Sequence, residues 1–231
     1  MNQLSLDFDE PAYPRFDKLL GHANAELIYT LQQEHDQFLY LWGERGSGKS
    51  HILQAWVGQA LQAGYSAVYI DAAQTSLTDS MVADADYVAV DQVEKLRSRE
   101  QNALFNLFNR FRNSRHGYLL LASDLHPSRL NMREDLRTRV AYCLPYEVKP
   151  LSREEKINAL TNMAHTRQLN IDPKIYTYLL DNWRQDMDSL LHMFNDLAAY
   201  SITVGKPITL PLLRQLLKQQ EQLCFNPQGE I

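Results

Sequence analysis

The stretch Gly43-Glu44-Arg45-Gly46-Ser47-Gly48-Lys49-Ser50 decides the fold of this 231-residue chain. It satisfies the pattern G-x-x-x-x-G-K-[ST], in which glycines let backbone N–H groups turn towards a phosphate with no Cβ in the way. The lysine supplies a point charge for the β- and γ-phosphates, and the serine supplies a hydroxyl for Mg²⁺. Residues 38–42 before it indicate a buried strand, and residues 49–63 after it carry helical spacing. An ordinary glycine-rich turn is the alternative, and this strand–loop–helix context disfavours it.

We therefore predict a nucleotide-binding loop that includes the residue after the motif. The expected contacts are Gly43, Glu44, Arg45, Gly46, Ser47, Gly48, Lys49, Ser50 and His51.

A second residue that interacts with the metal ion is expected at the end of another buried strand. Residues 87–90 indicate that strand, and Asp91 follows it, so that Ser50 would bind Mg²⁺ and Asp91 would reach the ion through water. An ordinary turn aspartate is the alternative for Asp91. Gln92 comes next, at a position where nucleotide hydrolases commonly carry a second acid. Glutamine can orient water but is no general base at neutral pH, so we expect weak or no intrinsic ATPase activity.

Strand and helix patterns alternate through the first two thirds of the chain. Apolar runs at 38–42, 67–70, 87–90 and 117–122 alternate with amphipathic stretches such as 49–63 and 99–111, which predicts an α/β fold with a parallel sheet covered by helices on both faces. After about residue 150 only helical patterns follow, at 152–166, 173–183, 187–203 and 210–223. We predict a tail at 1–12, a nucleotide-binding domain at 13–149, a helical domain at 150–225 and a tail at 226–231.

Composition excludes several classes of protein. With 45% hydrophobic and 22% charged residues the chain is ordinary and globular, and no apolar run reaches the ~18 residues that span a bilayer. Cys143 and Cys224 are too few for a disulfide framework or a four-cysteine zinc site. The first ten residues carry three acids and no base, unlike a secretory or transit peptide, so we expect a cytoplasmic protein without a membrane partner.

The net charge of −5 means that any contact with nucleic acid must come from a local patch. Residues 94–115 hold six bases against two acids and form the one such stretch that we identify. A solvated helix face is the favoured interpretation, and weak, indirect contact with DNA is the alternative.

With these elements in place, the chain resembles the AAA+ ATPases and, within them, the bacterial replication initiator DnaA. Residues 15–24 (RFDKLLGHAN) are similar to the segment that folds over adenine, which adds Phe16 and Leu20 to the expected nucleotide contacts. The resemblance implies an AAA+ P-loop NTPase fold with a small helical lid domain. It also implies an adenine nucleotide, ADP or ATP, with Mg²⁺.

Two further segments match the pattern of this family. Residues 119–124 (LLLASD) resemble its fourth strand, with the polar sensor at Ser123 or Asp124. Residues 136–140 (LRTRV) resemble the L-x-S-R segment that carries an arginine finger, which puts the finger at Arg139, with Arg137 as the neighbouring candidate. A surface arginine paired with Glu134 or Asp135 is the alternative for Arg139.

The lid departs from the family pattern. The position expected to hold a phosphate-sensing arginine is Asp188. Either Arg184 substitutes from one turn earlier, or the lid does not sense phosphate, and the second interpretation is favoured. Together with Gln92, this suggests a domain that holds a nucleotide more than it hydrolyses one.

At the N-terminus, Gln3-Leu4-Ser5-Leu6-Asp7-Phe8 resembles the Q-L-x-L-x-F peptide by which replication proteins dock on the sliding clamp. An extended peptide presents alternate side chains to a groove as apolar anchors, and a glutamine adds amide hydrogen bonds. An edge strand of the protein's own sheet would show the same alternation. The sequence ends at Ile231, where a DnaA initiator continues into a helix-turn-helix domain, so a relative of DnaA without that domain is expected.

The resemblance implies a negative regulator of replication initiation. Its expected partners are the β sliding clamp of DNA polymerase III and ATP-bound DnaA, on which Arg139 would act in trans, and a homodimer or AAA+-type oligomer is possible. Two alternatives stay open: an ATP-driven remodeller of the helicase-loader type, and an adaptor that joins clamp and initiator without chemistry.

Overall fold

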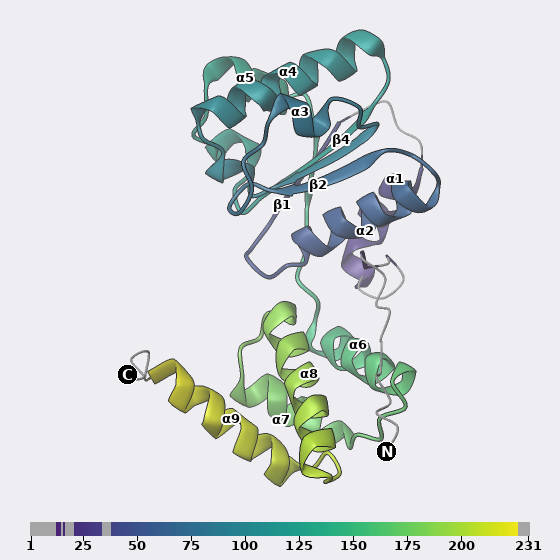
Figure 1. Cartoon of the computed structure of the whole chain (residues 1–231), viewed down its shortest axis with the longest axis vertical. Coiled ribbons are helices and arrows are strands. Elements are labelled where there is room, and N and C mark those ends of the chain that lie inside the picture. The colour runs from purple at the N-terminus through teal and green to yellow at the C-terminus, as the bar shows by residue number, and fades with distance from the viewer. Residues whose placement is uncertain (1–12, 15, 17–20, 34–37, 226–231) are drawn as a thin grey trace. The chain divides into compact units, whose positions relative to one another are not determined.

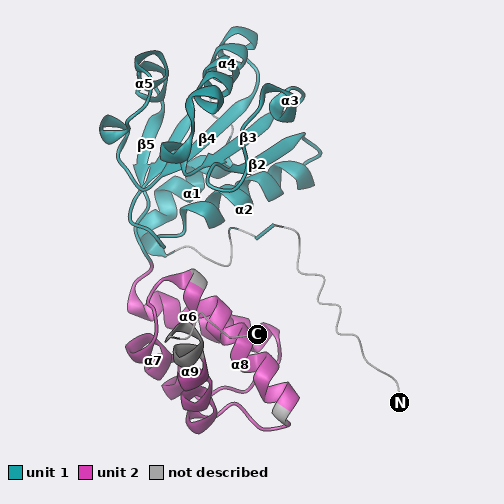
Figure 2. Cartoon of the chain, turned by 60° about the vertical axis from the view of Figure 1, so that its left-hand side comes forward, with its two compact units in different colours: residues 1–150 teal, residues 151–231 magenta. Residues whose placement is uncertain are grey.

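The computed structural model describes residues 13, 14, 16, 21–33 and 38–225, except for the side chains of residues 188, 204 and 220–225. The chain divides into two compact units, residues 1–150 and 151–231 (Figure 2). Each unit is described by itself.

A five-stranded parallel sheet organises the first unit. Its strands are β1 (Leu39–Trp42), β2 (Ala67–Asp71), β3 (Tyr87–Asp91), β4 (Tyr118–Ser123) and β5 (Leu144–Glu147), in the order β2-β3-β4-β1-β5. In register, Leu39 lies opposite Leu120 on β4 and Leu144 on β5. Because every pair is parallel, the carboxyl ends of all five strands meet at one edge of the sheet.

Helices cover both faces of this sheet (Figure 1). In chain order they are η2 (His22–Asn24), α1 (Ala25–Gln32), α2 (Lys49–Gln62), α3 (Asp79–Val82), η3 (Val93–Lys95), α4 (Ser98–Ser114), η4 (Pro127–Arg129) and α5 (Glu134–Val140). Successive residues of a strand point to opposite faces, so Leu39 and Leu41 pack with α1 and α2, while Tyr40 packs with α3, α4 and α5. The central strands β1, β3 and β4 are mostly buried between these two layers of helices, which confirms the predicted α/β fold.

The second unit is helical, as the sequence predicts. Its helices are α6 (Arg153–Thr166), α7 (Pro173–Asn182), α8 (Met187–Val204) and α9 (Leu210–Phe225). Ser152 and Glu155 form a capping box, in which the serine Oγ accepts from the Glu155 N–H and a glutamate oxygen accepts from the Ser152 N–H. Asp172 caps α7 with a single hydrogen bond, in which its Oδ1 accepts from the Lys174 N–H at 2.8 Å, and Pro173 lies in the first helical turn. The four helices enclose a core that includes Leu160, Leu179, Leu190, Phe194 and Leu213.

One strand was not predicted. β5 contains Pro145, and its four residues are exposed or half-buried, so its sequence lacks the continuous apolar run of β3 and β4. Pairing with β1 places this strand at the edge of the sheet, where proline is tolerated. None of the described helices is long and apolar enough to cross a membrane.

Candidate functional site

The predicted phosphate loop joins β1 to α2 at the carboxyl edge of the sheet. Gly43 has φ +154°, and a Cβ there would lie 2.5 Å from the Val148 carbonyl oxygen, so the first position of the loop requires glycine. Gly48 has φ +99° and is the N-cap of the 14-residue helix α2. The loop therefore presents a free helix N-terminus, the backbone arrangement that favours an anion.

The loop lysine is buried beside one of the two predicted sensors. Lys49 is 6% exposed, and its Nζ donates to the carbonyl oxygens of Gly43 and Glu44, both at 2.8 Å. It also forms an ion pair with Asp124, at 2.9 Å between Nζ and Oδ1. The end of β4 and the phosphate loop are thus brought together.

The two residues predicted to hold the metal ion are in contact. Asp91 ends β3 and is 1% exposed. Its carboxylate accepts hydrogen bonds from the Ser50 hydroxyl, from Tyr69 Oη at 3.0 Å and from the Gln92 N–H at 2.8 Å. Burial raises the pKa of Asp91 above its usual range, while these hydrogen bonds oppose the shift. A carboxylate and a hydroxyl at one point form an oxygen donor set suited to Mg²⁺.

Gln92 is held by a residue that sequence reasoning missed. It has φ +53°, and its Nε2 donates to Asp71 Oδ1 at 2.8 Å. Asp71 also accepts from the Ala73 N–H at 2.9 Å and from Gln74 Nε2 at 2.8 Å. Asp71 is the last residue of β2, beside β3, and its place after an apolar run is the signal that could have identified it.

The second predicted sensor has a different environment from Asp124. Ser123 is fully buried, and its Oγ donates to Glu94 Oε2 at 2.7 Å and accepts from the Leu125 N–H at 3.0 Å. Asp124, by contrast, has a side chain that is 45% exposed and faces Lys49. Asp124 is therefore the sensor candidate that contacts the phosphate loop, and Glu94 is a second partner that the sequence did not indicate.

The residues present fit a phosphate-bearing ligand. Ser47 Oγ and His51 Nε2 are buried, and neither has a hydrogen-bond partner among the described residues. Both belong to the loop or the first turn of α2, where a bound phosphate chain would meet them. Burial lowers the pKa of His51 to about 4, so its imidazole is neutral near pH 7.

The structure describes only some of the other residues that the sequence predicts to contact the nucleotide or the clamp. Glu44 and Arg45 are exposed on the loop. Phe16 is 8% exposed and packs in the core with α1 and α2. Leu20 and the segment 3–8 lie outside the described residues, and so does the side chain of Asp188. Arg184 is exposed and favours the charged form of Asp186, which caps α8.

Arg139 lies near the amino ends of the strands, whereas the phosphate loop lies at their carboxyl ends. With Phe38, Phe108, Arg112 and Tyr142 it lines a hollow of about 240 Å³, which we name the Arg139 hollow. Phe38 immediately precedes β1, whereas the phosphate loop follows it. At ~3.3 Å per residue, the four residues of β1 put about 13 Å between these two ends.

The neighbouring arginines are paired, and Arg139 is not. Arg137 forms an ion pair with Glu134, and Arg133 pairs with Asp135 at 2.6 Å. In the described part of the chain no carboxylate pairs with Arg139, whose guanidinium lies 5.7 Å from the centre of the Phe105 ring. The alternative in which Arg139 pairs with Glu134 or Asp135 is therefore not observed.

The strand–loop–helix phosphate site, the strand order and the C-terminal helical unit define an AAA+ P-loop fold. The family model for the bacterial DnaA ATPase domain matches residues 17–147, and the model for the Hda lid domain matches residues 153–217. The chain belongs to the bacterial DnaA ATPase domain family, and its C-terminal unit is a lid of the Hda type.

Two solved structures of DnaA share this fold. Domain III of the Thermotoga maritima replication initiation protein DnaA is similar with a TM-score of 0.76 and 21% identity, over 89% of this chain and 95% of that one. AMPPCP-bound DnaA from Aquifex aeolicus has a TM-score of 0.71 and 20% identity, over 94% of this chain and 73% of that one. Protein NMB1076 from Neisseria meningitidis is 57% identical over 65% of this chain and 98% of that one, with a TM-score of 0.46.

Proposed function

We propose that this protein is a negative regulator of replication initiation that stimulates hydrolysis of DnaA-bound ATP in trans. The observation that carries the proposal is the place of Arg139, which has no acidic partner among the described residues and lies at the edge of the sheet opposite its own phosphate loop. From there its guanidinium serves a nucleotide on a second protein. It would neutralise charge that develops on the transferring phosphoryl group, an effect worth about 10³–10⁵ in rate in GTPase systems.

The protein's own site is proposed to hold an adenine nucleotide with Mg²⁺. The loop residues 43–51 would bind the phosphates, Lys49 and the N–H groups of α2 would meet their charge, and Ser50 and Asp91 would hold the ion. Bound Mg²⁺ would neutralise phosphate charge. The DnaA from Aquifex aeolicus binds AMPPCP, which supports an adenine nucleotide here. Gln92 is no base and is held by Asp71, so we propose weak or no intrinsic ATPase activity.

Recruitment is proposed to depend on the segment Gln3-Leu4-Ser5-Leu6-Asp7-Phe8, docked as an extended peptide on a sliding clamp loaded on DNA. The clamp would bring the protein to ATP-bound DnaA, and the product would be inactive ADP-bound DnaA.

The test is an assay of DnaA-bound ATP hydrolysis with DNA-loaded clamp and this protein. Arg139→Ala is expected to remove the stimulation while both partners still bind. Arg137→Ala is the matched control, because it removes a guanidinium two residues away on the same helix and costs only an exposed ion pair. Equal loss in the two variants would contradict the role of Arg139, and unchanged stimulation in Arg139→Ala would support the adaptor instead. Appreciable ATPase activity of the protein alone would support the remodeller.

The clamp segment is tested separately. Replacing Leu6 and Phe8 together by Ala is expected to abolish clamp binding with no change in melting temperature. A lowered melting temperature would instead identify these residues as part of the protein's own sheet.

A further inference from the structure

A tyrosine on one edge strand of the sheet contacts the carboxylate that ends the neighbouring strand. Tyr69 is the third residue of β2, and its Oη lies 3.0 Å from Asp91 Oδ2. In register Tyr69 lies opposite Ala89, two residues before Asp91, so its side chain reaches along the sheet towards the carboxyl edge to make this contact. Neither the phosphate loop nor the proposed contacts of Mg²⁺ account for a phenol at this point.

Helix α2 holds the same hydroxyl from its other side. The Gln54 side chain forms a hydrogen bond with Tyr69, and Gln54 lies four residues after Ser50 on α2, which is about one turn. The Ser50 hydroxyl donates to Asp91. Because an ionised carboxylate only accepts, the one hydroxyl hydrogen of Tyr69 goes to Asp91 and the Gln54 amide donates to Tyr69 Oη. These four residues, Ser50, Gln54, Tyr69 and Asp91, join α2, β2 and β3, and we name them the Asp91 network.

The Asp91 network fixes the direction in which the carboxylate can still accept. An ionised carboxylate has about four acceptor positions. Among the described residues, the Gln92 N–H uses one on Oδ1, Tyr69 Oη uses one on Oδ2, and the Ser50 hydroxyl uses a third. About one position remains, which is what a water molecule on Mg²⁺ requires. Without the Tyr69 hydroxyl, the carboxylate would be free to rotate and present this position elsewhere.

Packing alone accounts for the ring of Tyr69 but not for its hydroxyl. The ring is half-buried against the core formed with α1 and α2. A phenylalanine would fill the same space without burying a polar group, which costs free energy unless it is hydrogen-bonded. The ordinary pKa of a tyrosine is about 10, so the hydroxyl keeps its proton near pH 7 and is a permanent donor. The hydroxyl is therefore the part of Tyr69 that serves the site.

From this network we infer that Tyr69 is a positioning residue for the metal ion, whose hydroxyl orients the Asp91 carboxylate towards Mg²⁺ bound with the nucleotide. The inference rests on the proposed nucleotide site. Removing a residue that orients the contacts of a metal ion typically costs about 10–100-fold in metal affinity. Because Asp91 is proposed to reach the ion through water, the lower end of this range is expected. Asp71 holds Gln92 in the same manner, so β2 supplies a partner for each of the two residues at the end of β3.

The experiment measures how Mg²⁺ strengthens the binding of a ribose-labelled fluorescent ADP to the full chain, without clamp or DnaA. The affinity is measured at saturating Mg²⁺ and in EDTA, and the ratio of the two affinities is the metal-dependent part. For Tyr69→Phe this ratio should fall by about 10-fold, while the affinity in EDTA stays the same. Tyr146→Phe is the matched control and should leave the ratio unchanged. Tyr146 is the third residue of the other edge strand and packs against the same core, but its hydroxyl lies 3.2 Å from Thr30 Oγ1.

A double-mutant cycle with Asp91→Asn separates the orientation of the carboxylate from a general loosening of the site. Asp91→Asn should remove most of the response to Mg²⁺, and adding Tyr69→Phe should not lower the ratio further, because Tyr69 acts through this carboxylate. An unchanged ratio in Tyr69→Phe, an equal loss in Tyr146→Phe, an equal loss of affinity with and without Mg²⁺, or a further fall of the same size in the double variant would each overturn the inference and leave the nucleotide site standing. A wild-type chain whose ADP binding does not respond to Mg²⁺ would overturn the metal site itself, and the inference with it.

Discussion

Gly43→Ala tests whether the phosphate loop is held as tightly as its contacts indicate. A methyl group at this position would lie 2.5 Å from the Val148 carbonyl oxygen and 3.3 Å from Ser47 Oγ. The carbonyl cannot move away easily, because the Val148 N–H donates to the Trp42 carbonyl oxygen at 2.7 Å and so continues the pairing of β5 with β1. The alanine must therefore displace the strand pair or distort the loop.

The expected cost has two parts. Overpacking against fixed backbone costs about 1–3 kcal/mol, and a backbone conformation that L residues rarely adopt costs about 1–3 kcal/mol more. A total of about 2–6 kcal/mol corresponds to a fall in melting temperature of roughly 5–20 °C for a chain of this size. Gly64→Ala is the matched control, since Gly64 has φ +87° and nothing within 4 Å of an added Cβ. Its cost is the strain alone, about 1 kcal/mol.

Thermal and urea unfolding of both variants without nucleotide measure this difference. The expected result is that Gly43→Ala unfolds well below Gly64→Ala and takes up nucleotide poorly. If the two variants unfold at the same temperature, the contact with Val148 does not constrain the loop and the reasoning is wrong.

Three further predictions follow from single contacts. Gln92→Glu places a carboxylate against Asp71 and should lower the free energy of unfolding by about 1–3 kcal/mol, while Asp71→Asn in the same chain should restore most of it; a double-mutant cycle without coupling would contradict the pairing. The pKa of His51 is lowered to about 4 in the folded protein, so the unfolded chain binds its proton first as the pH falls. The contribution of neutral His51 to the free energy of unfolding is fully present above about pH 6.5 and should fall by up to about 3 kcal/mol towards pH 4. His51→Gln should remove this part of the pH dependence, as measured by urea unfolding at several pH values. Arg110→Ala should cost about 1–3 kcal/mol through the carbonyl oxygens that it leaves unpaired, whereas Arg112→Ala should stay within about 0.5 kcal/mol; equal melting temperatures would show that Arg110 is no more structural than Arg112.

The parts of the fold that could be predicted are those that local sequence determines. β3 and β4 are continuous apolar runs because helices cover both their faces, and the phosphate loop is set by glycine and lysine at fixed spacing. Ser152 and Glu155, three residues apart, predict the start of α6 as a capping box. In each case the deciding residues are neighbours in the chain.

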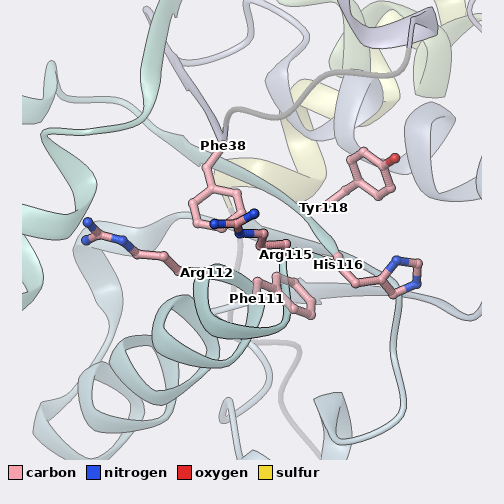
Figure 3. Close-up of a pocket in the computed structure, with 7 residues that line it drawn as sticks. Phe38, Phe111, Arg112, Arg115, His116 and Tyr118 are labelled. Atoms are coloured by element: carbon pink, nitrogen blue, oxygen red, sulfur yellow. The ribbon is translucent and has the colours of Figure 1, made fainter.

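The site contacts that the sequence does not predict depend on the order of the strands in the sheet. Asp71 meets Gln92 because β2 lies beside β3, and Glu94 meets Ser123 because β3 lies beside β4. Nothing within either segment specifies its neighbour in the sheet. β5 was missed because an edge strand needs no continuous apolar run. The count of charges in residues 94–115 does not show that Arg110 binds backbone carbonyl oxygens while Arg112 and Arg115 line a hollow at the end of α4 (Figure 3).

The same two strands carry both candidate sites at their opposite ends. β1 begins after Phe38, which lines the Arg139 hollow, and ends at the phosphate loop, while its neighbour β4 begins at Tyr118 and ends beside Asp124 at Lys49. At ~3.3 Å per residue the six residues of β4 hold these ends about 20 Å apart. Both strands are buried in the centre of the sheet, so no local rearrangement shortens that distance. An arginine at the amino edge can therefore reach a phosphate only on another molecule, and this is why the proposed chemistry of Arg139 requires a partner.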